Sequence, residues 1–223
     1  MSRGTPSIHT FVSPTFEENA YVVSMSSSDS DPAGWVIDPG LGPQAETILE
    51  FLAGHSIRLE RILLTHGHAD HIAGVDTLCR AHPEVEVLIS RPEHPMLSDP
   101  QLNLSAPFGF TLQVESPARD ELEPGLSLDL GGSPWTVLDV SGHSPGGRAI
   151  YSAQAGVVFT GDALFCGSIG RTDLPGSSTQ RLLANIRDNL LSLPDETVVY
   201  AGHGPTTTIG NERKSNPFLT DAH

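Results

Sequence analysis

The stretch "LLTHGHADHIAG" (Leu63–Gly74) places three histidines and an aspartate between positions 66 and 71, directly after an apolar, strand-like run. In an extended segment, residues two apart point the same way, so His66 and His68 share a direction. Asp70 and His71 then stand at the start of a predicted helix and turn back toward the end of the strand. We expect these four side chains to converge from one tight turn, which favours a metal site over a merely hydrophilic loop.

Three other strand-like runs end in the same way. "VLDVSG" is followed by His143, "VVFTG" by Asp162 and "VVYAG" by His203, and a glycine stands just before each of these residues. Glycine permits a sharp turn or a close backbone approach, and strand ends in a packed sheet are rigid anchor points for side chains. The sequence therefore predicts that these three residues join the first four.

The number of these side chains predicts two divalent metal ions. Neutral imidazole and carboxylate suit Zn²⁺, our first choice, and also iron or manganese, and seven of them exceed what one four-coordinate ion needs. Asp162 is the natural bridge, because each of its two carboxylate oxygens can bind one ion. A structural zinc site is disfavoured, since such sites are closed and rich in cysteine.

Composition and charge restrict the partners of the chain. Its 223 residues suffice for one sizeable core, so we expect a single domain over 1–223. With 12 Lys and Arg against 27 Asp and Glu, the net charge is −15. This balance disfavours nucleic acid and anionic membrane as partners, and it leaves the oligomeric state open.

The beginning of the chain and its cysteines bear on its compartment. The stretch "MSRGTPSIHTFVSPTF" (1–16) has no apolar core of signal-peptide length, and no segment approaches the roughly 20 apolar residues that span a bilayer. Cys79 and Cys166 give no disulfide framework. We therefore expect a cytoplasmic protein with reduced thiols, in which Cys166 is a small core or pocket residue.

The alternation of strand-like and helical runs predicts an α/β fold with more than one sheet. "SSSDSDPAG" (26–34) is typical of a hairpin loop. Helices are predicted at 43–54, 70–82 and 177–193, and strands at 7–13, 19–25, 34–40, 58–65, 84–90, within 126–143, and at 148–153, 156–162 and 196–203. The stretch 91–123 has no clean period, as is typical of either a functional lid or a partly mobile segment. Asn103 and Phe108 in it are candidates to line a pocket.

The motifs "THGHADH", "SGHSPGG", "FTGDALF" and "AGHGP" together resemble the metallo-β-lactamase superfamily. The resemblance runs from "NAYVV" and "VIDPG" near the start to "NERKSNPFL" near the end. It implies an αββα four-layer sandwich with the metals in a cleft along one edge. It also implies that His66, His68 and His143 bind the first ion, that Asp70, His71 and His203 bind the second, and that Asp162 bridges them.

Within that superfamily, "GDALFCGSIGRTDLP" and "HGPTTTIGNERKSNPFL" look most like the single-domain glyoxalase II-like hydrolases, which act on thioesters such as S-D-lactoylglutathione. Full-length glyoxalase II has a C-terminal helical domain that helps to hold glutathione, whereas only residues 204–223 follow His203 here. Persulfide dioxygenases are the main alternative. They share "GRTD" and use one iron, held by the counterparts of His66, His143 and Asp162. Hydrolysis of another ester or lactone is a further alternative.

The resemblance implies a metallohydrolase in which a metal-bridging hydroxide attacks the thioester carbonyl, because a bound metal lowers the pKa of water from about 15.7 to about 7. Asp70 is expected to act as a catalytic ligand that also orients this hydroxide. Arg171, in the glycine-rich "GSIGRTD" loop, could bind a substrate carboxylate such as that of a glutathione conjugate. Alternatively, Arg171 pairs with Asp173 and fixes the loop.

Overall fold

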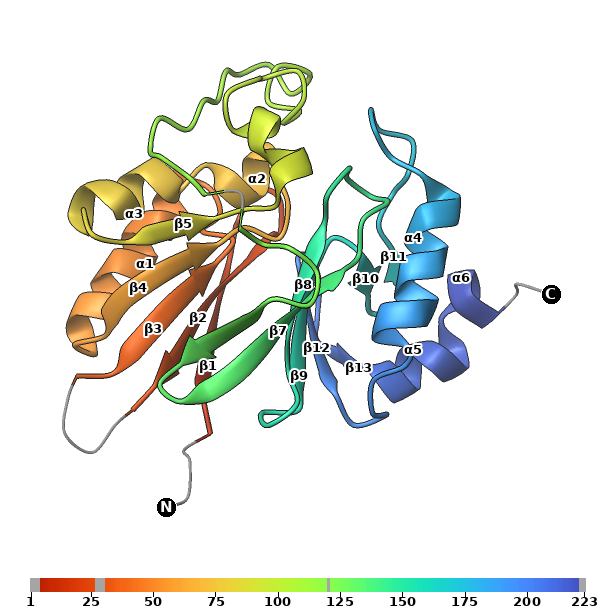
Figure 1. Ribbon diagram of the computed structural model, residues 1–223. Helices are drawn as coiled ribbons and strands as arrows, with labels where there is room; N and C mark the ends of the chain where they lie inside the picture. Colours follow the sequence, from red (N-terminus) through yellow and green to blue (C-terminus); the bar gives the residue numbers. More distant parts are fainter. Residues whose placement is uncertain (1–4, 27–30, 120, 221–223) are drawn as a thin grey trace.

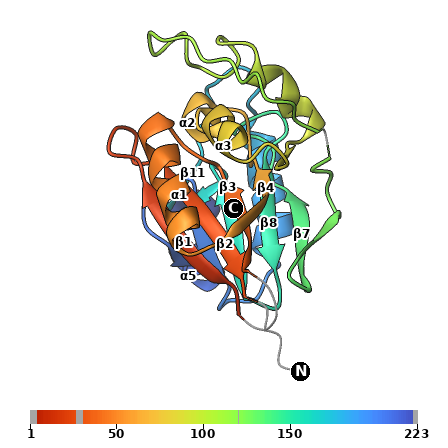
Figure 2. The ribbon, with the colours of Figure 1, turned by 90° about the vertical axis from the view of Figure 1, so that its left-hand side faces the viewer.

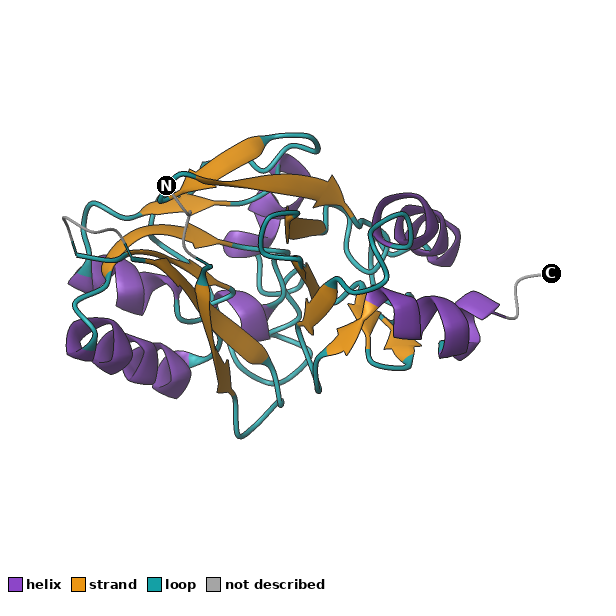
Figure 3. Cartoon of the chain, turned by 90° about the horizontal axis from the view of Figure 1, so that it is seen from below, coloured by secondary structure: helices purple, strands orange, loops and turns teal. Residues whose placement is uncertain are grey.

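A computed structural model describes residues 5–26, 31–119 and 121–220, so parts of the predicted hairpin loop at 26–34 and of the N-terminal stretch lie outside the described residues. Two β-sheets pack face to face, and helices cover the outer side of each sheet (Figure 1). Seen from below, the strands lie between two groups of helices (Figure 3). This arrangement confirms the predicted αββα four-layer sandwich.

The first sheet has the strand order β1-β2-β3-β4-β5, with β1 to β3 antiparallel and β3 to β5 parallel. Two helices lie over its outer face (Figure 2). The parallel neighbours need crossover connections, and the helices supply them. The elements of this half are β1 (Ser7–Val12), β2 (Asn19–Met25), β3 (Ala33–Ile37), α1 (Gly42–Gly54), β4 (Arg58–Leu63), α2 (Ala69–Ile72), α3 (Val75–Ala81) and β5 (Glu86–Leu88).

The second sheet has the order β13-β12-β9-β8-β7-β6, in which only β12 and β9 are parallel neighbours. Because β7 and β9 are both antiparallel to β8, the strands β7, β9 and β12 all run in the same direction. The elements of this half are β6 (Ser127–Leu130), β7 (Ser133–Asp139), β8 (Arg148–Ser152), β9 (Val157–Gly161), β10 (Leu164–Phe165), β11 (Ser168–Ile169), α4 (Thr179–Asn185), the π-helix η2 (Ile186–Leu190), β12 (Val198–Ala201), β13 (Thr207–Thr208), α5 (Ile209–Ser215) and α6 (Pro217–Thr220).

Three apolar cores hold the four layers together. Val22 and Val36 face α1 and α3, whereas their strand neighbours Tyr21 and Trp35 face the other sheet, as the period of two in a strand requires. Trp35 lies against Trp135 of the opposite sheet with ring centroids 6.0 Å apart. A third core joins the second sheet to α4, η2 and α5.

The structure differs from the predicted elements in several places. The helix predicted at 70–82 is two helices, because the N–H of Gly74 donates to the carbonyl of Gly40 instead of continuing the helix. The irregular stretch 91–123 begins with a 3-10 helix, η1 (Arg91–Leu97). The segment 207–220, for which no element was predicted, forms β13, α5 and α6. Within the described residues, no helix is both long and apolar enough to cross a membrane.

Candidate metal centre

The seven predicted metal-binding side chains lie at one end of the sandwich. His143, Asp162 and His203 follow β7, β9 and β12, and because these strands run in the same direction their carboxyl ends meet at one edge of the second sheet. The turn after β4 and the short helix α2 bring the other four residues to the same place from the first sheet. The structure thus brings together all seven residues that the sequence singles out.

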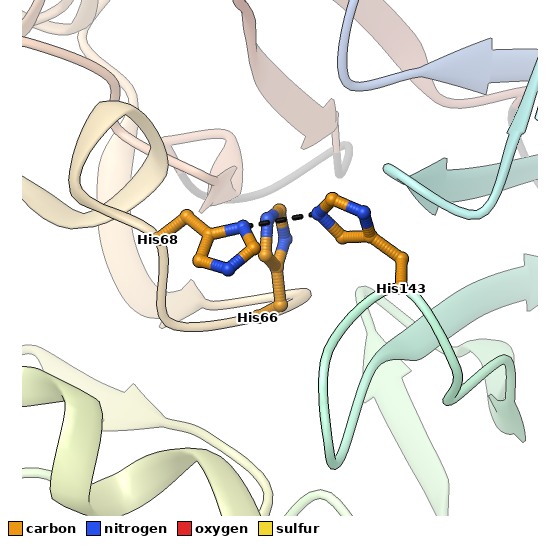
Figure 4. A group of neighbouring side chains, drawn as sticks. All are labelled: His66, His68 and His143. Atoms are coloured by element: carbon orange, nitrogen blue, oxygen red, sulfur yellow. Dashed lines mark hydrogen bonds between the residues drawn. The ribbon is translucent and has the colours of Figure 1, made fainter. Parts of the chain in front are cut away.

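Three histidines form a first group, His66, His68 and His143, whose ligand nitrogens lie within 4.8 Å of one another (Figure 4). The Nδ1 atom of His68 is 3.0 Å from the Nε2 atom of His143. All three side chains are buried. Three imidazole nitrogens at this spacing match the ligand set of one divalent ion.

A second group consists of Asp70, His71 and His203, again with ligand atoms within 4.8 Å. Asp162 lies between the two groups. Its Oδ2 atom is 3.6 Å from Nε2 of His143 and 3.5 Å from Nε2 of His203. Its Oδ1 atom is 3.4 Å from Nε2 of His71. The carboxylate therefore contacts both groups at once.

Asp38 orients this site, and the sequence analysis did not identify it. Its Oδ1 atom accepts from the backbone N–H of Thr65, and its Oδ2 atom accepts from the Thr65 hydroxyl and from Nδ1 of His71. Asp38 has a φ of +48°, a strained value for a residue other than glycine. Such strain clusters at functional sites. The signal in the sequence was an aspartate directly before the Pro-Gly pair that ends β3.

Four of the five histidines have their Nδ1 atom engaged away from the centre. Nδ1 of His143 donates to the carbonyl of Arg171, and Nδ1 of His203 donates to the carbonyl of Phe16. Nδ1 of His71 bonds Asp38, and Nδ1 of His66 lies 3.0 Å from the Thr65 hydroxyl, which itself donates to Asp38. These bonds engage the Nδ1 side of each ring and direct its Nε2 toward the centre, as metal-ligating histidines require. In the structure Nε2 of His143 contacts Nδ1 of His68.

The free atoms fit a metal. Nε2 of His66, Nε2 of His71 and Oδ1 of Asp162 are buried and make no hydrogen bond. A buried polar atom without a partner costs about 1–3 kcal/mol, and three of them within and between these two groups would be a large defect in a protein that bound nothing there. A pair of divalent cations would satisfy all three.

The protonation states also suit cations. Burial, together with the neighbouring histidines, lowers the pKa of His66 well below its usual value and that of His68 to about 3, so both rings are neutral at pH 7. Burial by itself raises the pKa of Asp162, but His71, His66 and His143 outweigh it and lower that pKa well below its usual value. The first group therefore presents two neutral imidazoles, those of His66 and His68, beside a carboxylate. In the second group burial by itself lowers the pKa of His71 and of His203, but the carboxylates of Asp162 and Asp70 outweigh it and raise both pKa values, so a cation bound there would take the place of the ring protons.

Glu93 joins the two histidine-bearing loops, and the sequence analysis missed it as well. It is fully buried in η1, where Oε2 accepts from the N–H of Gly67 at 2.9 Å and Oε1 accepts from the N–H of Gly146. A side chain at Gly67 would meet Met96, and one at Gly146 would meet Ser90 and Pro92. Glycine is needed at both positions because η1 packs directly on these loops.

A pocket of about 370 Å³ opens above these residues. His68, Asp70, His143, Asp162 and His203 line its floor. Arg171, the predicted substrate ligand, also lines it, but its guanidinium makes two 2.7 Å bonds to the carboxylate of Asp173. Both sequence alternatives for Arg171 therefore have support, and the ion pair is the arrangement seen.

The other candidates are placed as follows. Asn103 and Phe108 line the pocket as expected, although the Asn103 amide is used within its own loop. Cys79 and Cys166 are free thiols. Cys166 is exposed in the turn between β10 and β11, so its prediction as a core or pocket residue is wrong.

The fold and this arrangement define a family. The chain belongs to the metallo-β-lactamase superfamily: the model of that superfamily matches residues 15–203, which include all seven residues of the candidate centre. The resemblance seen in the motifs is thereby confirmed.

Individual relatives narrow the comparison. Hydroxyacylglutathione hydrolase GloC of Haemophilus influenzae is 36% identical over 192 residues, which cover 86% of this chain and 89% of the relative. The solved structure of BLEG-1, a B3 metallo-β-lactamase, is 37% identical with a TM-score of 0.87 over 96% of this chain and 100% of that one. That of TTHA1623 in a di-iron-bound form is 37% identical with a TM-score of 0.81 over 95% and 100%. The chain is thus similar to metallohydrolases over nearly its whole length.

Proposed function

We propose that this protein is a dinuclear metal-dependent hydrolase that cleaves thioesters such as S-D-lactoylglutathione. The observation that carries the proposal is the position of Asp162, whose Oδ2 atom lies 3.6 Å from His143 and 3.5 Å from His203. In this proposal His66, His68 and His143 hold one ion, Asp70, His71 and His203 hold the other, and Asp162 bridges them. Zinc is our first choice for both ions, and iron is the alternative, because TTHA1623 has been solved in a di-iron-bound form.

Two bound ions would supply Lewis acidity and lower the pKa of a bound water, so that a nucleophile is available at neutral pH. The chain's own residues would hold and orient the reactants. The Asp70 carboxylate lines the pocket floor and lies 3.4 Å from Nε2 of His203. There it can accept a hydrogen bond from a bound water or hydroxide and so orient that nucleophile. Asp38 bonds Nδ1 of His71 and keeps the His71 ring aligned.

The pocket favours a substrate whose leaving group departs without help. Among its lining residues, every titratable side chain except Arg171 is one of the proposed metal ligands. The pocket lining therefore offers no spare general acid of ordinary pKa. A thiol ionises near pH 8.5 and leaves as a thiolate, whereas an amine must be protonated. This chemistry supports a thioester rather than an amide.

The similarity to BLEG-1 makes β-lactam hydrolysis the second candidate, because that activity is in the name of a relative of 37% identity. The absence of a spare acid in the pocket lining argues against it. A cephalosporin assayed beside the thioester separates the two.

The test is elemental analysis of protein purified without added metal, followed by assay of thiol release from S-D-lactoylglutathione on the same sample. We expect close to two ions per chain and hydrolysis. Asp162→Ala should lose metal and turnover, whereas Asp188→Ala, at an exposed position on η2, should keep both. One iron per chain, no hydrolysis and oxygen uptake with glutathione persulfide would overturn the proposal in favour of a dioxygenase.

A further inference from the structure

The pocket above the candidate metal centre has two unlike sides. Its floor consists of the polar residues of the centre. The remaining lining is almost entirely apolar and comprises Phe16, Leu104, Pro107, Phe108, Phe110 and Leu174. A ligand whose reacting atoms touch the floor must therefore place its other atoms against hydrocarbon.

Two of these residues contact each other edge to face. The rings of Phe16 and Phe108 lie 5.6 Å apart at an interplanar angle of 79°. Phe16 stands in the connection between β1 and β2, and its carbonyl accepts from Nδ1 of His203 at 3.0 Å. Phe108 belongs to the loop that follows η1. One ring of the pair is thus tied directly to the floor of the site.

Phe108 and Phe110 are more exposed than most aromatic side chains of this chain. Phe108 is 62% exposed and Phe110 is 36% exposed, and among the described residues Phe218 is the one other exposed aromatic. Large exposed apolar side chains gathered at one place mark ligand-binding grooves. Here both rings gather at the entrance to the pocket.

The loop that presents Phe108 is held in place by its own hydrogen bonds. The buried Asn103 side chain donates to the carbonyls of Met96 and Leu112, and the carbonyl of Ser105 accepts from the N–H groups of Phe108 and Phe110. Leu104, between them, has a φ of +69°. A leucine in this region is strained, and such strain persists where the surroundings fix it, commonly at ligand clamps. The apolar side of the pocket is therefore a formed surface.

Charge points the same way. Arg171 is the single cationic side chain among the lining residues, and Asp173 already engages its guanidinium through both carboxylate oxygens. The thiol half of a glutathione thioester carries two carboxylates and one ammonium group. The chain as a whole has a net charge of −15. Apart from ions bound at the centre itself, the carboxylates of an anionic leaving group would thus find little compensation in this lining.

We propose that the pocket selects thioesters or esters whose leaving group is uncharged and aromatic, with that group packed against the ring pair of Phe16 and Phe108. This inference rests on the proposed hydrolase function and narrows its substrate class. Glutathione thioesters would still react, because the centre supplies the same chemistry, but with a higher KM. Ring–ring contact in an apolar pocket favours offset or edge-to-face geometries, and Phe16 and Phe108 already adopt an edge-to-face geometry with each other. An aromatic guest would extend this cluster.

Three D-lactoyl thioesters test the proposal, because they share an acyl group and have alkyl thiol leaving groups. The thiols are phenylmethanethiol, which is uncharged and aromatic, N-acetylcysteamine, which is uncharged and polar, and glutathione. We expect kcat/KM for the phenylmethanethiol ester to exceed the other two by about tenfold or more, the range that pocket contacts of this size provide. Phe108→Ala should raise KM for that ester by about tenfold, and it should raise KM for the N-acetylcysteamine ester by a clearly smaller factor.

The control variant is Phe218→Ala, which removes an exposed ring on α6 that is not part of the pocket lining. It should not change the order of the three substrates. Equal kcat/KM for the three esters, preference for glutathione, or no effect of Phe108→Ala would overturn the substrate inference alone. No hydrolysis of any of them by protein with two ions per chain would overturn the hydrolase proposal itself.

Discussion

Replacing Glu93 should destabilise the protein and weaken metal binding together. Glu93 accepts from the N–H of Gly67, between His66 and His68, and from the N–H of Gly146, in the loop that carries His143. Glu93→Ala leaves both buried donors without an acceptor, at about 1–3 kcal/mol each, or about 2–6 kcal/mol in total. For a chain of this length, 1 kcal/mol corresponds to about 2–4 °C in Tm, so we expect Tm to fall by roughly 5–20 °C.

Metal affinity should also fall. The two hydrogen bonds of Glu93, which we call the Glu93 clamp, set the distance between the loop of His66 and His68 and the loop of His143. Nδ1 of His68 and Nε2 of His143 are 3.0 Å apart only while both loops rest on η1. Loss of a residue that positions metal ligands typically lowers affinity by about 10–100-fold. Glu93→Gln keeps one acceptor oxygen, so it should lie between the wild type and Glu93→Ala in both measurements.

The assays are thermal unfolding of metal-free protein and competition for Zn²⁺ against a chromogenic chelator. Glu46→Ala, on the exposed side of α1, is the matched control and should change neither quantity appreciably. If Glu93→Ala unfolded at the wild-type temperature and bound Zn²⁺ with wild-type affinity, the clamp argument would be refuted. A loss of stability with unchanged affinity would refute the link between the clamp and the ligands.

Three other predictions concern the surroundings of the site and the end of the chain. Burial raises the pKa of Glu18 from 4.5 to about 9; since the folded state then holds a proton that the unfolded chain has lost, stability should fall as pH rises between these values. Glu18→Gln should flatten this decline, as urea unfolding at about pH 5.5 and pH 8.5 would reveal, and parallel declines in both proteins would contradict the assignment. Glu212 accepts from the N–H of Gly167, the Thr207 hydroxyl and the Asn216 amide, so Glu212→Ala should lower the free energy of unfolding by about 2–5 kcal/mol, against almost nothing for the exposed Glu196→Ala. Removal of metal with a chelator should lower Tm, and Zn²⁺ at a hundredfold excess over Kd should restore roughly 3 kcal/mol; an unchanged Tm would mean that the folded state binds no ion.

Buried polar residues near the end of the chain have a structural function that the local sequence pattern did not indicate. The tail motif "NERKSNPFL" acts through Glu212 and Asn216, which fasten α5 to the turn between β10 and β11. That turn follows Asp162 closely in the chain. The tail therefore supports the edge of the second sheet on which the candidate centre stands.

The sequence by itself determined the family, most of the strands and helices along the chain, and the seven side chains that converge at one edge. It could do so because metal-binding residue types at strand ends are rare and because alternation in strands is a local property. The hydrogen-bond partners of those side chains were not local. Glu93 and Gly146 are 53 positions apart, and Asp38 and His71 are 33 apart.

Only the tertiary structure decided which ordinary residues serve the site. A buried glutamate, an aspartate before Pro-Gly and Phe16 have no distinctive spacing, so their positions at the site depend on which loops the four layers bring together. The same reason explains the break at Gly74, where a contact with the Gly40 carbonyl overrides the helical period. Local sequence specifies the chemistry of the ligands, whereas packing between distant segments specifies how they are held and what lies opposite them.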